Sequence, residues 1–156
     1  MGGSARSATR TTCAVVGGGP AGAMLSLLLA RAGVSVTLLE AHPDFDREFR
    51  GDTLHPSVME VMDQLGLAGR LLELRHSKVR SFTLDTPKGP FTTVDFSRLN
   101  TRFPYITMMP QASFLEFLTA EARRYPGFRL VMGARVRELV EEGGAVRGVR
   151  YESGDG

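Results

Sequence analysis

The sequence predicts an α/β fold organised around a parallel β-α-β unit, and three observations support this prediction. Residues 12–16 are short, β-branched and bounded by glycine, which is typical of a buried strand. Apolar residues from Ala21 to Ala32 recur at helical spacing, and Gly33 follows where a helix commonly ends. Residues 34–40 predict a second strand, so the two strands should lie parallel and be joined by a right-handed crossover.

The rest of the chain alternates between helices and strands. After the second strand, we expect a polar loop over 41–52, a helix from Pro56 to near Gly66 and a short helix over 67–74. A hairpin should follow over 79–96, turning at Pro87-Lys88-Gly89-Pro90, and then a strand over 105–109. The last predicted elements are a helix over 111–125, strands over 128–132 and 136–140, and a strand over 146–151 after Gly143-Gly144. The two longer helices should each bury one stripe: Val58, Val61, Met62 and Leu65 in the first, and Phe114, Leu115, Leu118 and Ala122 in the second.

The composition is that of a soluble globular domain. The chain has 156 residues, of which 42% are hydrophobic and 23% are charged, so one ordinary core is possible. A formal net charge of +2, without a basic block, favours neither a nucleic-acid partner nor a membrane partner. The apolar stretches fall far short of the ~20 residues that a membrane helix needs. A single cysteine, Cys13, excludes an internal disulfide, and the histidine and cysteine spacings match no zinc site, so no metal is expected.

The first residues need a separate interpretation. Residues 1–11 are small and polar and predict a flexible tail, followed by one domain over 12–156. The apolar segment after the tail is broken by Gly17-Gly18-Gly19-Pro20, which a secretory signal helix would not contain. With no signal expected and a lone cysteine, the cytoplasm is the predicted compartment.

Gly17, Gly19 and Gly22 form a G-x-G-x-x-G turn between the first strand and the first helix, which Pro20 and Ala21 open. In a Rossmann-like fold, the first glycine permits the tight turn, the second allows a pyrophosphate to approach, and the third allows close packing of helix on strand. The helix N-terminus offers unpaired N–H groups and the positive end of its dipole to phosphates. The alternative is a glycine-rich turn selected for packing alone, but the flanking elements favour dinucleotide binding.

Glu40 closes the second predicted strand, about twenty residues after the glycines. A carboxylate there can accept hydrogen bonds from both hydroxyls of an adenosine ribose. It would also repel a ribose 2′-phosphate, so NADP is a poor occupant of this pocket. The sequence therefore predicts a Rossmann-like domain for a dinucleotide that lacks this phosphate.

Three segments carry a more specific signal: V-V-G-G-G-P-A-G from Val15 to Gly22 with Glu40, F-R-G-D-T-L-H-P from Phe49 to Pro56 with the later Q-L-G-L, and Pro110-Gln111 at the start of a helix. Together they resemble the flavoprotein aromatic hydroxylases related to p-hydroxybenzoate hydroxylase. The resemblance spans about residues 12–151. It implies an FAD-binding domain with a parallel sheet and a β-hairpin insertion, in which a substrate-domain insertion starts around 78–109.

The resemblance also implies roles for single residues. The FAD pyrophosphate would be held by Gly17, Gly19 and Gly22, and the adenosine ribose would be bound by Glu40. Arg50, with the backbone of Gly51, Asp52 and Thr53, would lie along the flavin. Gln111 would reach the ribityl or pyrophosphate region. A planar guanidinium such as that of Arg50 suits a phosphate or a polar flavin edge, although a surface arginine in a charged loop is the alternative.

Two residues near this loop have competing interpretations. Asp52 could contact the flavin or pair with a neighbouring arginine, and the residues do not separate these roles. His55 precedes a helix, so we interpret it as a hydrogen-bonded capping residue in preference to a catalytic one.

By the same resemblance, NAD(P)H would reduce bound FAD, and O2 would then deliver one oxygen atom to a small organic or aromatic substrate. No side chain is nominated as catalytic, because the flavin carries this chemistry. The later Asp-Gly and Gly-Asp motifs of such enzymes are missing, so the chain is expected to be an N-terminal portion that needs the remainder of a longer chain. Two alternatives stay open: an NAD-dependent dehydrogenase, which the hairpin disfavours, and a non-catalytic dinucleotide-binding module.

Overall fold

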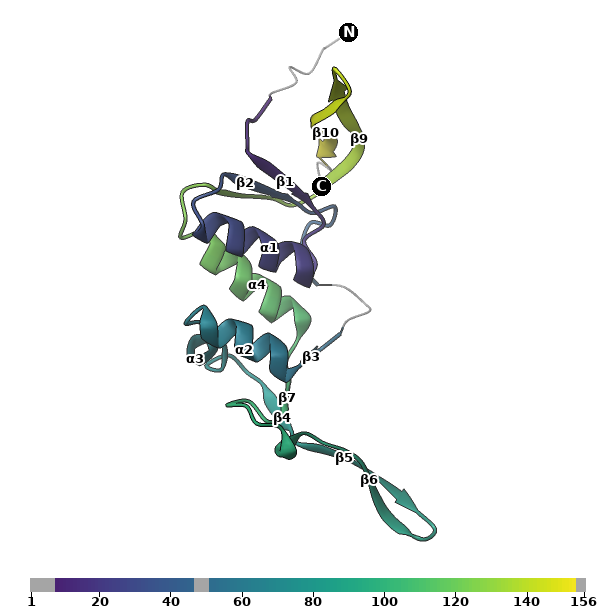
Figure 1. Ribbon diagram of the computed structural model, residues 1–156. Helices are drawn as coiled ribbons and strands as arrows, with labels where there is room; N and C mark the ends of the chain where they lie inside the picture. The colour runs from purple at the N-terminus through teal and green to yellow at the C-terminus, as the bar shows by residue number, and fades with distance from the viewer. Residues whose placement is uncertain (1–7, 47–50, 154–156) are drawn as a thin grey trace. The chain divides into compact units, whose positions relative to one another are not determined.

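The computed structural model describes residues 8–46 and 51–153 (Figure 1). These residues form two compact units. The first contains residues 8–45 and 115–153, and the second contains residue 46 and residues 51–114. The chain thus leaves the first unit once and returns to it through a single helix.

The first unit is built on a parallel sheet in the order β1-β2-β8. Its strands are β1 (Cys13–Val16), β2 (Val36–Leu39) and β8 (Phe128–Val131), and α1 (Pro20–Arg31) joins the first two. Cys13 pairs with Val36, and Val36 pairs with Phe128 on its other side. The predicted β-α-β unit is therefore confirmed, and the strand expected near 128–132 extends its sheet.

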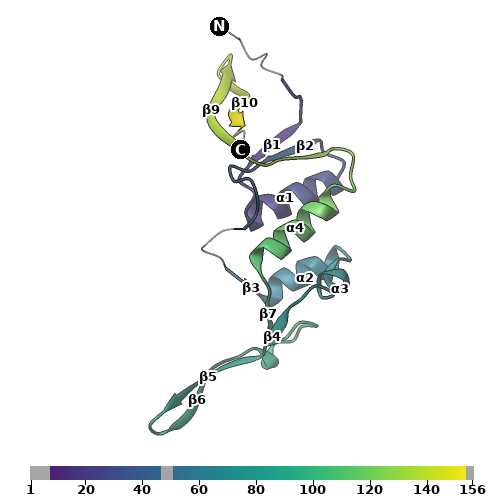
Figure 2. The same cartoon turned by 180° about the vertical axis from the view of Figure 1, so that it is seen from behind.

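The core of this unit lies between the sheet and the helices. All four residues of β2 are buried, and α1 turns Ala23, Ser26, Leu27 and Ala30 inward. Helix α4 (Gln111–Ala122) buries the predicted stripe: Leu115, Leu118 and Ala122 belong to this unit, and Phe114 belongs to the second. Figures 1 and 2 show α1 and α4 on one side of the parallel sheet and the hairpin of β9 and β10 on the other. Small side chains on α1 allow the helix to lie close to the strands.

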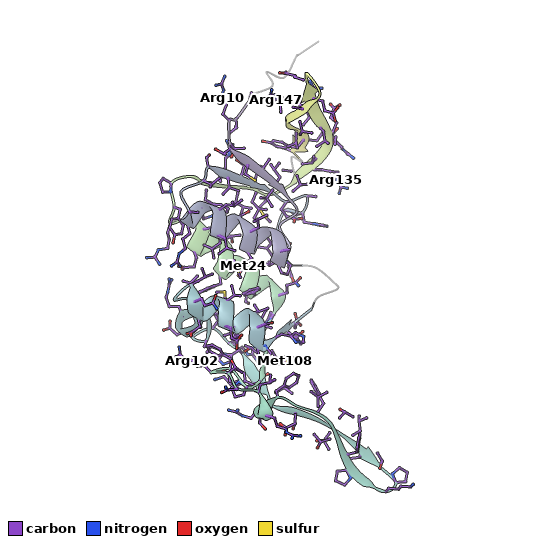
Figure 3. All side chains as sticks on the ribbon, viewed as in Figure 1. Arg10, Met24, Arg102, Met108, Arg135 and Arg147 are labelled. Carbon is purple, nitrogen blue, oxygen red and sulfur yellow. The ribbon has the colours of Figure 1, made fainter. Side chains whose placement is uncertain are left out.

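Strands β9 (Ala134–Glu142) and β10 (Ala145–Ser153) pair in antiparallel fashion. Both turn glycines have positive φ angles, +60° for Gly143 and +76° for Gly144, which explains why glycine occupies both positions. The hairpin carries exposed arginines, two of which form ion pairs: Arg137 with Glu152 at 2.8 Å and Arg150 with Glu138 at 3.0 Å. Arg135 on β9 and Arg147 on β10 are labelled in Figure 3. This arrangement is a solvated charged face.

The second unit holds an antiparallel sheet in the order β3-β7-β4 and two helices. Its elements are β3 (Thr53–Leu54), α2 (Pro56–Gln64), α3 (Ala68–Leu71), β4 (Ser77–Val79) and β7 (Ile106–Met108). The helix positions agree with the prediction, but the inward face of α2 does not. Met59 and Met62 are fully buried, whereas Val61 is 37% exposed. The buried stripe runs along Pro56, Met59 and Met62, three residues apart, which leaves Val61 beside it.

The predicted hairpin is formed by β5 (Ser81–Thr86) and β6 (Gly89–Asp95). Gly89 has a φ of +108°, and a short 3-10 helix, η1 (Phe96–Arg98), follows the second strand. All residues of β5 are exposed, including Phe82 and Leu84. Among the described helices, none is long and apolar enough to cross a membrane.

Candidate functional site

The turn between β1 and α1 has the backbone that a G-x-G-x-x-G motif requires. Gly17 has a φ of +102°, a conformation that side chains disfavour, and its N–H donates to the Leu39 carbonyl at 2.8 Å. Gly19 caps the helix in an extended conformation, and Pro20 stands at the first helical position with Ala21 after it. Proline loses no helical hydrogen bond at this position.

The second and third glycines of the motif differ in what surrounds them. A Cβ on Gly22 would lie 2.0 Å from the carbonyl oxygen of Gly17, so no side chain fits there without movement of the backbone. A Cβ on Gly19 would meet no atom within 4 Å, so the described residues leave the space beside it open. Gly22 therefore serves helix–strand packing, and Gly19 leaves room for a ligand to approach the N-terminus of α1.

Glu40 follows β2 and is 2% exposed. Its Oε2 accepts a hydrogen bond from the Gly18 N–H at 2.6 Å, and its Oε1 accepts one from the His42 N–H at 3.0 Å. The His42 Nδ1 atom also lies 2.6 Å from Oε1. The structure thus places the predicted carboxylate directly against the glycine turn.

Sequence reasoning missed the residues that hold this carboxylate. A Cβ on Gly18 would lie 3.0 Å from the Cβ and Oε2 atoms of Glu40 and 3.2 Å from the Phe45 ring, so this glycine is also needed for close packing. His42 gave no sequence signal beyond its position two residues after Glu40. Phe45, which is 8% exposed, belongs to the segment that the sequence predicts as a polar loop.

The second unit brings together Gly51, Asp52 and Gln111. The pairing of Thr53 with Met108 places these residues side by side, and Met108 is labelled in Figure 3. Asp52 accepts hydrogen bonds from the Gln111 N–H at 3.1 Å through Oδ1 and from the Met109 N–H at 3.0 Å through its carbonyl. A Cβ on Gly51 would lie 3.9 Å from the Gln111 Nε2 atom. The structure therefore gives Asp52 a third role, which is to accept from the first N–H of α4.

Two further predictions concern the loop before α2. Arg50 lies outside the described residues, so its role stays a prediction. His55 is the N-cap residue of α2, but its side chain is exposed and makes no capping hydrogen bond. Its backbone carbonyl accepts from the N–H groups of Val58 and Met59 instead. The interpretation of the His55 side chain as a hydrogen-bonded cap was therefore wrong: His55 occupies the cap position and bonds to the helix through its backbone carbonyl.

The first-unit geometry fits the phosphates and ribose of an adenine dinucleotide. It combines a turn that excludes side chains, open space at a helix N-terminus and a buried carboxylate at the end of the neighbouring strand. In the part of the chain that the structure describes, no group of three or more His, Cys, Asp or Glu residues could hold a metal ion.

Comparison with known proteins identifies the ligand class. The family described as FAD binding domain matches residues 10–156. The 6-methylpretetramide 4-monooxygenase of Streptomyces rimosus is 37% identical over 139 residues, which cover 89% of this chain and 33% of that protein. The anhydrotetracycline hydroxylase structure from the same species has a TM-score of 0.74 at 26% identity and covers 92% of this chain and 30% of that one.

A second solved structure, the FAD-dependent chondrochloren halogenase of a myxobacterium, has a TM-score of 0.77 at 27% identity. It covers 94% of this chain and 34% of that one. The chain thus spans about a third of the length of the relatives that it matches. The chain belongs to the FAD binding domain family and forms the FAD-binding portion of the type found in aromatic flavin-dependent monooxygenases.

Proposed function

We propose that this chain is the FAD-binding portion of a monooxygenase that uses NAD(P)H and O2 to oxygenate a small organic or aromatic substrate. The observation that carries the proposal is the turn at Gly17–Gly22, where a Cβ on Gly22 would strike the Gly17 carbonyl and the buried Glu40 carboxylate faces the loop. The monooxygenase and hydroxylase names of the relatives support the reaction class.

Each binding residue has a stated task in this proposal. The pyrophosphate would be held by Gly17, Gly19, Pro20, Ala21 and Gly22, the adenosine ribose by Glu40, the flavin side by Arg50, Gly51 and Asp52, and the ribityl region by Gln111. The first N–H groups of α1 have no partner within the helix and would donate to phosphate oxygens. Glu40 would accept from ribose hydroxyls and disfavour a 2′-phosphate at the same position.

When bound, FAD supplies the redox chemistry that takes electrons from NAD(P)H and activates O2. The residues of this chain bind and orient the cofactor, and none of their side chains needs to act as a nucleophile or metal ligand. The substrate would be selected by residues in the remainder of a longer chain. With a net charge of +2 and a single cysteine, we place the protein in the cytoplasm with small-molecule partners and without nucleic acid.

The test is to purify the chain, denature it and identify the released ligand by absorbance and chromatography. FAD is the expected ligand. Glu40→Gln and Arg50→Ala should each lower the FAD content, and Arg135→Ala on the exposed β9 strand is the matched control. Release of NAD would favour the dehydrogenase alternative. A colourless protein, both for this chain and for a longer chain that contains it, would contradict the proposal.

A further inference from the structure

Two segments of the chain fix the carboxylate of Glu40: the glycine turn before α1 and the residues that follow β2. Gly18 donates its N–H to Oε2 from the glycine turn, and His42 approaches Oε1 with both its N–H and its ring Nδ1. The residue is 2% exposed, so any rotation of the carboxylate would break charge-assisted hydrogen bonds in a place that water hardly reaches. The orientation of this group is therefore set by its neighbours.

His42 is itself held in a fixed place. Its backbone carbonyl accepts from the Gly133 N–H at 2.9 Å, and the Glu40 carbonyl accepts from the Ala134 N–H at 2.7 Å. Because an ionised carboxylate only accepts hydrogen bonds, Nδ1 is the donor in the 2.6 Å contact. The His42 side chain is 55% exposed, so its imidazole forms the solvent-facing wall beside a buried carboxylate.

We propose that His42 is a positioning residue for the adenosine ribose: it holds the Glu40 carboxylate in the orientation that accepts hydrogen bonds from the ribose hydroxyls. This inference rests on the proposed function, in which Glu40 binds the ribose. A carboxylate that is held in this orientation accepts a hydrogen bond from the ribose 2′-hydroxyl. The site should therefore prefer an adenosine that carries this hydroxyl over one that lacks it. Removal of the imidazole takes away one of the two donors to Oε1, so the carboxylate is held less firmly by the backbone N–H groups of Gly18 and residue 42.

The experiment measures the dissociation constants of FAD and of 2′-deoxyadenosine FAD for the wild-type chain, His42→Ala and His42→Asn. For His42→Ala we expect FAD affinity to fall about tenfold, with a similar loss of the preference for FAD over the deoxy analogue. Asparagine carries an amide donor near the position of Nδ1 and should restore most of both. His76→Ala is the matched control, since His76 Nδ1 lies 2.8 Å from the Leu74 carbonyl, also two residues away, outside this site.

The outcomes separate this inference from the proposed function. If Glu40→Gln weakens FAD binding but His42→Ala keeps the wild-type affinity and preference, the positioning role is wrong and Glu40 keeps its assignment. An equal loss of affinity for both ligands in His42→Ala, with the preference intact, would also overturn the role and indicate a general structural effect. If neither the wild-type chain nor a longer chain that contains it binds FAD, or if Glu40→Gln binds FAD unchanged, the proposed function fails and the inference fails with it.

Discussion

The glycine turn of the first unit and the β5–β6 hairpin of the second are held in place in opposite ways. The turn lies against β2, whose four residues are all buried, and its own glycines leave no room for side chains at Gly18 and Gly22. The hairpin exposes Phe82, Leu84, Phe91 and Val94, with Phe82 paired to Val94 and Leu84 paired to Phe91. The hairpin depends on its backbone ladder and on cross-strand pairs, whereas the turn depends on close packing at Gly18 and Gly22.

This difference indicates where the sequence tolerates change. A position whose neighbours are backbone atoms cannot accept even one added carbon, because the backbone has no other rotamer to adopt. A cross-strand pair that faces solvent loses little when one member is shortened. The four predictions below test this contrast, from the largest expected effect to the smallest.

Gly22→Ala should have the largest effect. Its new Cβ would lie 2.0 Å from the Gly17 carbonyl oxygen, so we expect loss of FAD retention and a free energy of unfolding lowered by at least about 3 kcal/mol. Flavin content and urea unfolding measure these changes. Gly69→Ala in α3 is the matched control, since a Cβ there meets no atom within 4 Å. Retention of FAD by Gly22→Ala would show that the turn is loose.

Leu38→Ala and Leu84→Ala compare the two regions directly. Leu38 is fully buried in β2, and its truncation should lower the free energy of unfolding by about 3 kcal/mol through lost burial and a cavity. Leu84 is 58% exposed, so its truncation should change this free energy by less than about 0.5 kcal/mol. Urea denaturation followed by circular dichroism gives both values. Equal losses for the two variants would mean that the hairpin face is packed in solution.

Asp52→Ala tests the contact between the loop after residue 50 and the start of α4. Loss of the acceptor for the Gln111 N–H should cost about 1 kcal/mol of stability, as for other helix caps. Asp52→Asn keeps an acceptor oxygen and should cost less. Asp85→Ala, on the exposed hairpin, is the control and should leave the urea midpoint unchanged. A wild-type midpoint for Asp52→Ala would show that water replaces the carboxylate.

Ser97→Ala should have the smallest effect, on the proton affinity of one exposed group at the end of the hairpin. The Ser97 hydroxyl and N–H donate to Asp95 and lower the pKa of its carboxyl, the hydroxyl being the larger cause. A lowered pKa stabilises the folded protein at pH values above the pKa that Asp95 has in the unfolded chain. This stability is lost as the pH falls through the pKa that Asp95 has in the folded protein. Nuclear magnetic resonance titration should show a higher Asp95 pKa in Ser97→Ala and no change in Ser57→Ala.

Local patterns predicted most of the fold. The strand at 12–16, the helix that ends before Gly33 and the strand at 34–40 depend on residues close in sequence, and the structure confirms all three. Periodicity failed for the face of α2, because the pattern allows either Val61 or Met59 to join Met62 on the inward face, and only the packing partner decides which of the two is buried. The side-chain cap expected of His55 was also wrong, because only the backbone carbonyl of His55 bonds to the helix and its side chain faces solvent.

The residues of the candidate site also fall into those that local patterns predict and those that they do not. The motif residues Gly17, Gly19, Gly22 and Glu40 were predictable, since a turn, a helix start and a strand end are all local features with known chemistry. The partners of these residues were not: Gly18 and His42 meet the Glu40 carboxylate through folding, and Asp52 meets Gln111 across 59 positions of sequence. The sequence by itself predicted a dinucleotide ligand through its turn and its terminal acid, and the family comparison identified that ligand as FAD. The tertiary structure decided which groups orient that acid, because hydrogen bonds between distant segments depend on distances that no local pattern contains.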